Sequence, residues 1–270
     1  MTLLISSTLL LTDASVACAQ DSFANSVVSY TPGTSISSSY TNSSAALGAP
    51  SLTASLTSPA YGNTNIVGVG LGGELTLAFN LPLINDPADH ASGMDFTIFG
   101  NQFFTLSGTN ISGIYDHPGL TVWVSQDDTN FYQLVAPDGL PHGADDLYPT
   151  QGSGNPLLPV SASLSLTNFM GQTSAQALAL YNGSAGGASY SISWAQDSLS
   201  NAVDLSSISY VMIKGTSGYG YIDGISRVES VPEPSASALL LMGLGGLGGL
   251  LFYRRWCVSP EKLKRLFPNT

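Results

Sequence analysis

The sequence predicts an all-β protein, an antiparallel β-sandwich followed by a single C-terminal transmembrane helix. Short runs of β-prone residues recur along the chain, and turn-forming residues separate them, including many of its 29 glycines and 15 prolines. The two cysteines lie near the ends, at Cys18 and Cys257, so the region between them has no disulfide framework and must be stabilised by apolar burial. Close to the C-terminus, residues 236–253 form an apolar run of 18 residues without a charge.

The first expected strands are residues 66–71 and 75–79, which are rich in Val, Leu and Phe and are separated by a glycine pair. Residues 94–99 form the next strand. Their hydrophobicity alternates, so we expect the even-numbered side chains, such as Phe96 and Ile98, on one face and the odd-numbered ones on the other.

A hairpin is expected between residues 120–125 and 131–135, because the segment that joins them contains the Asp and Asn residues that favour tight turns. Two further strands, residues 208–213 and 219–228, are separated by a Gly-Thr-Ser-Gly sequence.

One helix is expected at residues 174–181, which are rich in Ala and Leu and are followed by an Asn-Gly pair that suits a helix end. Residues 21–58 are rich in Ser and Thr and show little apolar periodicity, so we expect this segment to be loosely ordered.

The charge of the body, residues 20–230, is strongly acidic. It contains 15 acidic residues against two basic ones, Lys214 and Arg227, a net charge of −13. Nucleic-acid binding needs clustered Lys and Arg, so we expect no nucleic-acid partner. A body of roughly 210 residues is long enough to form one hydrophobic core.

Both ends of the chain indicate export. Residues 1–19 contain a short apolar region and end in Ala17-Cys18-Ala19, a cleavage pattern of secretory signal peptides. The apolar run 236–253 would span roughly 27 Å as a helix, enough to cross the hydrocarbon core of a bilayer. The positive residues after it predict that residues 256–270 form a basic cytoplasmic tail, with the body across the membrane.

The segment 231–255 resembles the PEP-CTERM sorting signal of Gram-negative bacteria, in which a Pro-Glu-Pro motif precedes a Gly/Leu-rich membrane helix and an arginine cluster. The matching residues are Val231, Pro232, Glu233, Pro234, Arg254 and Arg255. This resemblance implies that exosortase is a partner, that the inner membrane holds an intermediate, and that processing delivers the protein to the outer surface or the extracellular matrix. It also implies an association with biofilm and exopolysaccharide export.

The chain departs from that signal by continuing for 15 residues after the arginines. An ordinary C-terminal anchor that keeps an envelope protein in the membrane is the alternative, because the apolar run fits both interpretations.

Several segments of the body also resemble a family of bacterial surface proteins with a jelly-roll, galactose-binding-like domain. The similar segments are residues 45–50, 71–79, 95–101, 122–128 with 131–132, and 221–225. The resemblance implies a jelly-roll-like fold and a structural or binding role in preference to catalysis. For the body as a whole we expect a matrix or envelope protein that binds exopolysaccharide.

A calcium site is the metal site that the sequence allows, with Asp127, Asp128 and Asp223 as candidate ligands, because Ca²⁺ binds carboxylate and carbonyl oxygens. The alternatives are that the aspartate pair caps a turn and that Asp223 is an outward strand residue. The histidines also have acidic neighbours, as in Asp89-His90, but these sequences are typical of solvated turns, and we expect no cofactor at them.

Glycan binding is expected at Tyr219 and Tyr221, which lie two residues apart and so on one side of a strand. No Gly-x-Ser-x-Gly or His-Glu-x-x-His motif occurs, and we therefore expect no catalytic residues and no enzyme. The competing interpretation is a secreted polysaccharide-active hydrolase with paired carboxylates.

Overall fold

The computed structural model describes residues 21–86, 88, 90–116, 119–137 and 148–230. The expected signal peptide, the sorting segment 231–255 with its membrane helix, and the tail 256–270 lie outside these residues. Among the residues that are described, no helix is long and apolar enough to cross a membrane.

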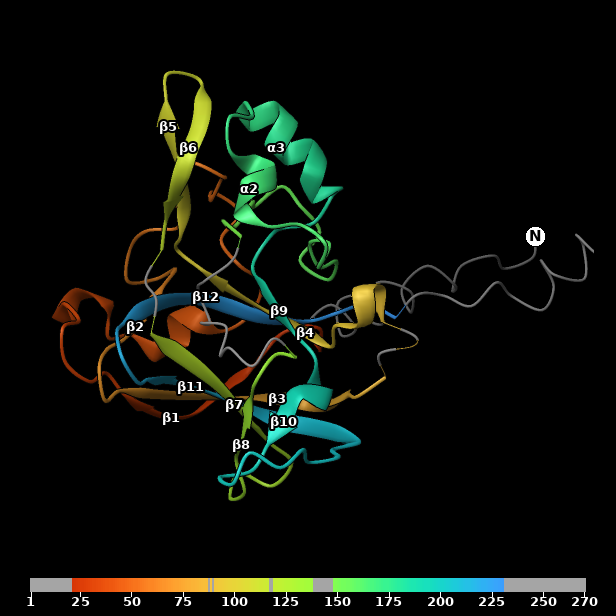
Figure 1. The fold of residues 1–270 in the computed structure, drawn as a ribbon. Helices are drawn as coiled ribbons and strands as arrows, with labels where there is room; N and C mark the ends of the chain where they lie inside the picture. The colour runs from red at the N-terminus through yellow and green to blue at the C-terminus, as the bar shows by residue number, and fades with distance from the viewer. Residues whose placement is uncertain (1–20, 87, 89, 117–118, 138–147, 231–270) are drawn as a thin grey trace, which may run out of the picture. The chain divides into compact units, whose positions relative to one another are not determined.

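The body contains two large antiparallel sheets and a separate two-stranded one (Figure 1). The larger has six strands in the order β1 (Ser26–Thr31), β3 (Glu74–Ile84), β11 (Ser207–Gly215), β7 (Leu120–Ser125), β8 (Tyr132–Leu134) and β10 (Ala195–Gln196). The smaller has four strands in the order β2 (Val67–Val69), β12 (Gly220–Arg227), β4 (Phe96–Gly100) and β9 (Ala188–Tyr190). All seven expected strand segments therefore form strands.

The two sheets share one hydrophobic core. Side chains from the six-stranded sheet, such as Leu77 and Val211, and from the four-stranded sheet, such as Ile98 and Ile225, belong to the same buried cluster. Figure 1 shows the sheets as two layers, with β12 and β9 over β11 and β7. The predicted sandwich-like, all-β body is thus confirmed in its antiparallel sheets and common core.

Strand β4 is buried on both faces. Phe96 and Ile98 lie in the shared core, but Thr97 and Phe99 on the opposite face are also fully buried. The backbone around Gly187 covers that face, and a Cβ there would approach both side chains within 3.0 Å. Alternating hydrophobicity therefore indicated the strand correctly but not the environment of its outer face.

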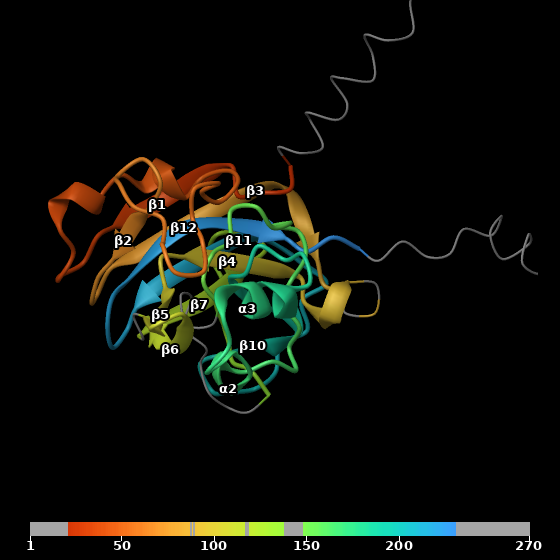
Figure 2. The same ribbon diagram turned by 90° about the horizontal axis from the view of Figure 1, so that it is seen from above.

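A second, smaller core lies beyond the four-stranded sheet (Figure 2). It is formed by the hairpin of β5 (Phe103–Ser107) and β6 (Asn110–Tyr115) together with α2 (Leu166–Phe169) and α3 (Ser174–Tyr181). The predicted helix is confirmed as α3, which begins with a capping box between Thr173 and Gln176 and ends at Asn182 in the left-handed conformation.

The prediction that residues 21–58 are loosely ordered is wrong. Strand β1 pairs with β3 along the edge of the six-stranded sheet, and two short 3₁₀ helices follow, η1 (Ser38–Tyr40) and η2 (Ser43–Ala46). Strand β1 contains Val27, Val28, Tyr30 and Thr31, but none of its six residues is fully buried, so this edge strand lacks the alternating hydrophobic pattern on which strand recognition depends.

Candidate functional site

Four tyrosines from distant parts of the sequence lie together at one end of β12, and we call them the tyrosine platform: Tyr40, Tyr115, Tyr219 and Tyr221. The ring of Tyr221 contacts those of Tyr40 and Tyr219 edge to face, with centroids 5.2 and 6.2 Å apart. Tyr115 stacks on Phe103 at 5.2 Å. Edge-to-face pairs of this kind stabilise a fixed arrangement of rings.

The other three tyrosines of the platform also act on the hydroxyl of Tyr221. Burial is the main cause that raises the pKa of the Tyr221 hydroxyl, and the other three tyrosines raise it further, in the order Tyr219, Tyr40 and Tyr115. Tyr115 is 48% exposed, whereas the other three rings are half-buried. The platform therefore presents ring surface together with several hydrogen-bonding hydroxyls.

Strand pairing and a small apolar cluster hold the platform in place. Tyr221 lies opposite Gly68 of β2. Its ring and that of Tyr40 pack against a small buried cluster of Ala54, Ala60 and Ile66. The spacing of Tyr219 and Tyr221 predicted that these two residues lie together, but Tyr40 and Tyr115 come from other elements and carried no sequence signal. A glycan at this site stays a prediction.

Asp223, a candidate calcium ligand, lies on β12 two residues after Tyr221, where the pairing with β4 shifts register. It is only 2% exposed, and its Oδ2 accepts a hydrogen bond from the backbone N–H of Ser51 at 2.9 Å. Burial raises the pKa of this carboxyl to about 7, although the bond from Ser51 lowers it. Asp223 therefore ties the loop at Ser51 to the sheet.

Asp127 organises the turn between β7 and β8. Its Oδ1 accepts hydrogen bonds from the backbone N–H groups of Thr129 (3.0 Å) and Asn130 (2.9 Å), and its Oδ2 accepts one from Asn130 Nδ2 (2.8 Å). These hydrogen bonds hold the pKa of the Asp127 carboxyl well below its usual value, and those from Asn130 have the largest effect. Its neighbour Asp128 adopts a positive φ of 59°, typical of such turns.

The three candidate calcium ligands do not form one cluster. Asp127 and Asp128 lie in the β7–β8 turn of the six-stranded sheet, and Asp223 lies in the four-stranded sheet. Over the described ranges, no group of three or more His, Cys, Asp or Glu side chains could hold a metal ion. The turn-capping alternative accounts for the hydrogen bonds of Asp127. Calcium binding stays a prediction, and the described residues do not bring its three candidate ligands together.

His90 is not in a solvated turn, contrary to the interpretation of its sequence. Its Nδ1 lies 2.8 Å from Oδ1 of Asp95, which is 1% exposed. The other oxygen, Oδ2, accepts hydrogen bonds from Ile192 N at 2.6 Å and Ser191 Oγ at 3.2 Å. The hydroxyl thus donates to the carboxylate, whereas in a nucleophilic triad it donates to the histidine, so this cluster does not have the triad arrangement. His117 and His142 lie outside the described residues.

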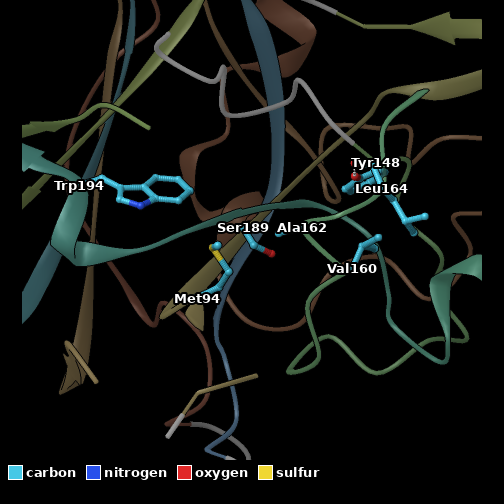
Figure 3. Close-up of a pocket in the computed structure, with 7 residues that line it drawn as sticks. All are labelled: Met94, Tyr148, Val160, Ala162, Leu164, Ser189 and Trp194. Atoms are coloured by element: carbon cyan, nitrogen blue, oxygen red, sulfur yellow. Dashed lines mark hydrogen bonds between the residues drawn. The ribbon is translucent and has the colours of Figure 1, made fainter. Parts of the chain in front are cut away.

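An apolar cavity of about 170 Å³ lies beside the second core. Figure 3 shows Trp194 on one side of it and Tyr148, Val160 and Leu164 on the other, with Met94 and Ser189 between them. Its hydroxyls have partners in the protein: Tyr148 donates to the carbonyl of Leu164 (2.7 Å), and Ser189 bonds Thr97 (2.8 Å). The cavity therefore offers apolar surface without an unpaired hydroxyl at these two residues.

The end of the body is fixed by backbone hydrogen bonds up to its last described residue. Val228 N donates to the carbonyl of Asp95 and Glu229 N to that of Leu157, both at 2.9 Å. Ser230 pairs with His90 in an antiparallel bridge. A cavity of about 430 Å³, which His90 and Ser230 help to line, lies at this point.

Residues 230–255 match the family model of the PEP-CTERM protein-sorting motif. The match includes all six residues predicted for the signal, Val231, Pro232, Glu233, Pro234, Arg254 and Arg255, which lie outside the described residues, and it confirms the prediction of this motif. No curated protein matches the chain. The motif marks an exported protein that exosortase processes and that reaches the surface through the membrane.

Proposed function

We propose that this exosortase-sorted chain is a non-catalytic surface or matrix protein whose β-sandwich body binds exopolysaccharide at the tyrosine platform. The arrangement of the four tyrosines is the observation that carries the proposal. The rings of Tyr40 and Tyr219 meet that of Tyr221 edge to face, and Tyr115 is near enough to help raise the pKa of the Tyr221 hydroxyl. Sugars present apolar C–H faces bordered by hydroxyls, and tyrosine offers an apolar ring and a polar tip to match them.

The environment of the buried carboxylates supports a role without catalysis. In the described part of the chain, the buried acidic residues are Asp95 and Asp223. Asp95 bonds His90 and the backbone of Ile192, and Asp223 bonds the backbone of Ser51. Both carboxylates thus hold segments of the fold together, whereas a glycosidase needs two carboxylates facing a common groove.

The proposed route to the surface uses the apolar run 236–253 as a membrane helix in the inner membrane of a Gram-negative cell. Exosortase then processes the chain at Pro232-Glu233-Pro234. Mass spectrometry of the C-terminus in fractionated cells, with and without the transpeptidase, tests this route. The expected mature chain lacks Arg254 and Arg255 only when exosortase is present. A chain that keeps both arginines in either strain would leave the plain-anchor alternative.

Glycan binding is tested by replacing the ring that is most exposed. Tyr115→Ala should weaken retention on the cell's own exopolysaccharide at least tenfold, because the hydroxyl and the stacking surface are lost together. Tyr210→Ala is the matched control, since Tyr210 lies on β11 in the other sheet and is also partly exposed. Equal retention of the two variants would contradict the proposed site.

A further inference from the structure

The charge distribution of the body specifies which class of polysaccharide the tyrosine platform can take. Acidic polysaccharides carry a carboxylate, sulfate or phosphate on many of their sugar units, and proteins that bind them supply Lys or Arg. The body has 15 acidic residues, and its Lys and Arg residues are Lys214 and Arg227 alone.

Lys214 is already engaged within the protein. Its Nζ lies 2.8 Å from Glu74 Oε1 and 5.2 Å from the centroid of the Trp123 ring. These three residues come from neighbouring strands of the six-stranded sheet. The ammonium group therefore has both an anionic and an aromatic partner outside the platform.

Arg227 is engaged as well, and it lies at the opposite end of β12 from the platform. Six residues separate it from Tyr221, roughly 20 Å along a strand. Its guanidinium is half-buried and donates a hydrogen bond to the carbonyl of Leu81 at 3.2 Å. It therefore stands too far from the platform to pair with an anion there.

The residue that follows the platform's most exposed ring is itself acidic. Tyr115 is followed by Asp116, which is partly exposed. An anionic sugar on the platform would therefore be bound by an acidic body, with this acidic residue next in sequence to the platform, and the repulsion weakens as salt increases.

We propose that the tyrosine platform recognises an uncharged pyranose polysaccharide and excludes uronic-acid, sulfated and phosphorylated ones. This inference rests on the proposed glycan-binding function and names its ligand class. The rings of Tyr115 and Tyr219 receive the C–H face of the sugar, and their hydroxyls exchange hydrogen bonds with the sugar hydroxyls. Neither interaction needs a charge on the ligand.

The test is affinity electrophoresis of the full chain in non-ionic detergent through gels that contain one polysaccharide each. A neutral β-glucan, the polyuronate alginate and the polyamine chitosan serve as probes, at 20 and 300 mM NaCl. The β-glucan should retard the chain equally at both salt concentrations, and Tyr115→Ala and Tyr219→Ala should each weaken this retardation at least tenfold. Alginate should cause no retardation at either concentration.

Matched variants separate recognition from charge and from folding. Tyr219→Phe keeps the ring and should keep most of the retardation, and Tyr210→Ala should keep all of it. Chitosan should retard every variant alike at low salt and none at high salt, because the acidic body attracts a polycation without using the platform.

The inference and the function beneath it fail in different ways. Tyrosine-dependent retardation by alginate, with none by β-glucan, would overturn the uncharged ligand class and leave glycan binding in place. Retardation by none of the uncharged or acidic probes would overturn glycan binding itself.

Discussion

Nδ1 of His90 lies 2.8 Å from Oδ1 of the buried Asp95, and both residues also bind the end of the body through their backbones. Asp95 accepts the backbone hydrogen bond of Val228, and His90 pairs with Ser230, the last residue before the Val-Pro-Glu-Pro sequence. One side-chain contact thus stabilises the segment at which the folded body passes into the sorting signal.

Replacing His90 should destabilise the body. His90→Ala leaves Oδ1 of a buried carboxylate with one weak remaining partner, the backbone N–H of Asp86 at 3.4 Å, and this should cost about 1–3 kcal/mol of unfolding free energy. Urea unfolding of the variant measures the loss. The double variant His90→Ala/Asp95→Asn should recover part of it, because the unpaired charge is removed. No change in the urea midpoint for His90→Ala would show that the contact contributes nothing.

A flexible linker between the body and the motif should speed processing. Backbone hydrogen bonds hold Val228 and Glu229, and a transpeptidase that binds its substrate as an extended chain has to compete with these bonds. Inserting six Gly/Ser residues between Ser230 and Val231 should therefore raise the initial rate of C-terminal cleavage, measured by pulse-chase. The same insertion at the β5–β6 turn, after Gly108, is the control. An unchanged rate would mean that exosortase recognises only residues from Val231 onward.

The stability of the body should fall as the pH rises from about 4 to 7 because of Asp223. Burial raises the pKa of the Asp223 carboxyl in the folded protein to about 7, from an ordinary value of 3.8. The folded state therefore binds more protons than the unfolded state in this pH window. The contribution is complete below pH 3.8 and is lost as the pH passes the folded pKa.

Asp223→Asn isolates this effect, since the amide oxygen can still accept the hydrogen bond from Ser51 and cannot titrate. Urea unfolding between pH 4.5 and 8 should show a shallower pH slope for the variant. Asp127 and Asp197 do not interfere, because their lowered pKa values affect stability mainly below about pH 5 and do so equally in both proteins. Identical slopes for the two proteins would contradict the assignment.

Removing the ring of Phe169 should destabilise the second core. Phe169 is fully buried and contacts the rings of Phe104, Tyr148 and Tyr181, at centroid distances of 5.1 to 5.9 Å. Phe169→Ala should cost about 3–5 kcal/mol, as large cavities in cores do. Met170→Ala is the control, because its side chain is 43% exposed, and it should change the stability by less than about 0.5 kcal/mol. Similar midpoints for both variants in thermal or urea unfolding would contradict the packing role.

Sequence patterns revealed the central strands because β-branched and aromatic residues are dense there, as in Leu120–Ser125. They did not reveal the β5–β6 hairpin or α2, since the stability of these elements depends on contacts such as that of Phe104 with Phe169, which are 65 residues apart. Short elements of this kind become stable only through packing.

The candidate site was predictable to a similar extent. Strand periodicity placed Tyr219 and Tyr221 together, but nothing local in the sequence links them with Tyr40 or Tyr115. The sequence suggested Asp223 as a metal ligand because it does not show that this residue is buried. That burial depends on the loop at Ser51, 172 residues away in the chain. Asp127, by contrast, bonds residues within its own turn, and the sequence suggested that alternative directly.

The pairing of the body's two ends bears on when it can finish folding during export. The backbone N–H of Ala24 donates a hydrogen bond to the carbonyl of Ile225, and that of Arg227 donates one to the carbonyl of Ser22, so the first described residues bind the final strand, β12. This strand also lies between β2 and β4 in the four-stranded sheet. A chain that crosses the membrane amino end first delivers that strand last. Until it emerges, β2 and β4 lack their common neighbour, so we expect the domain to close only after β12 has crossed the membrane.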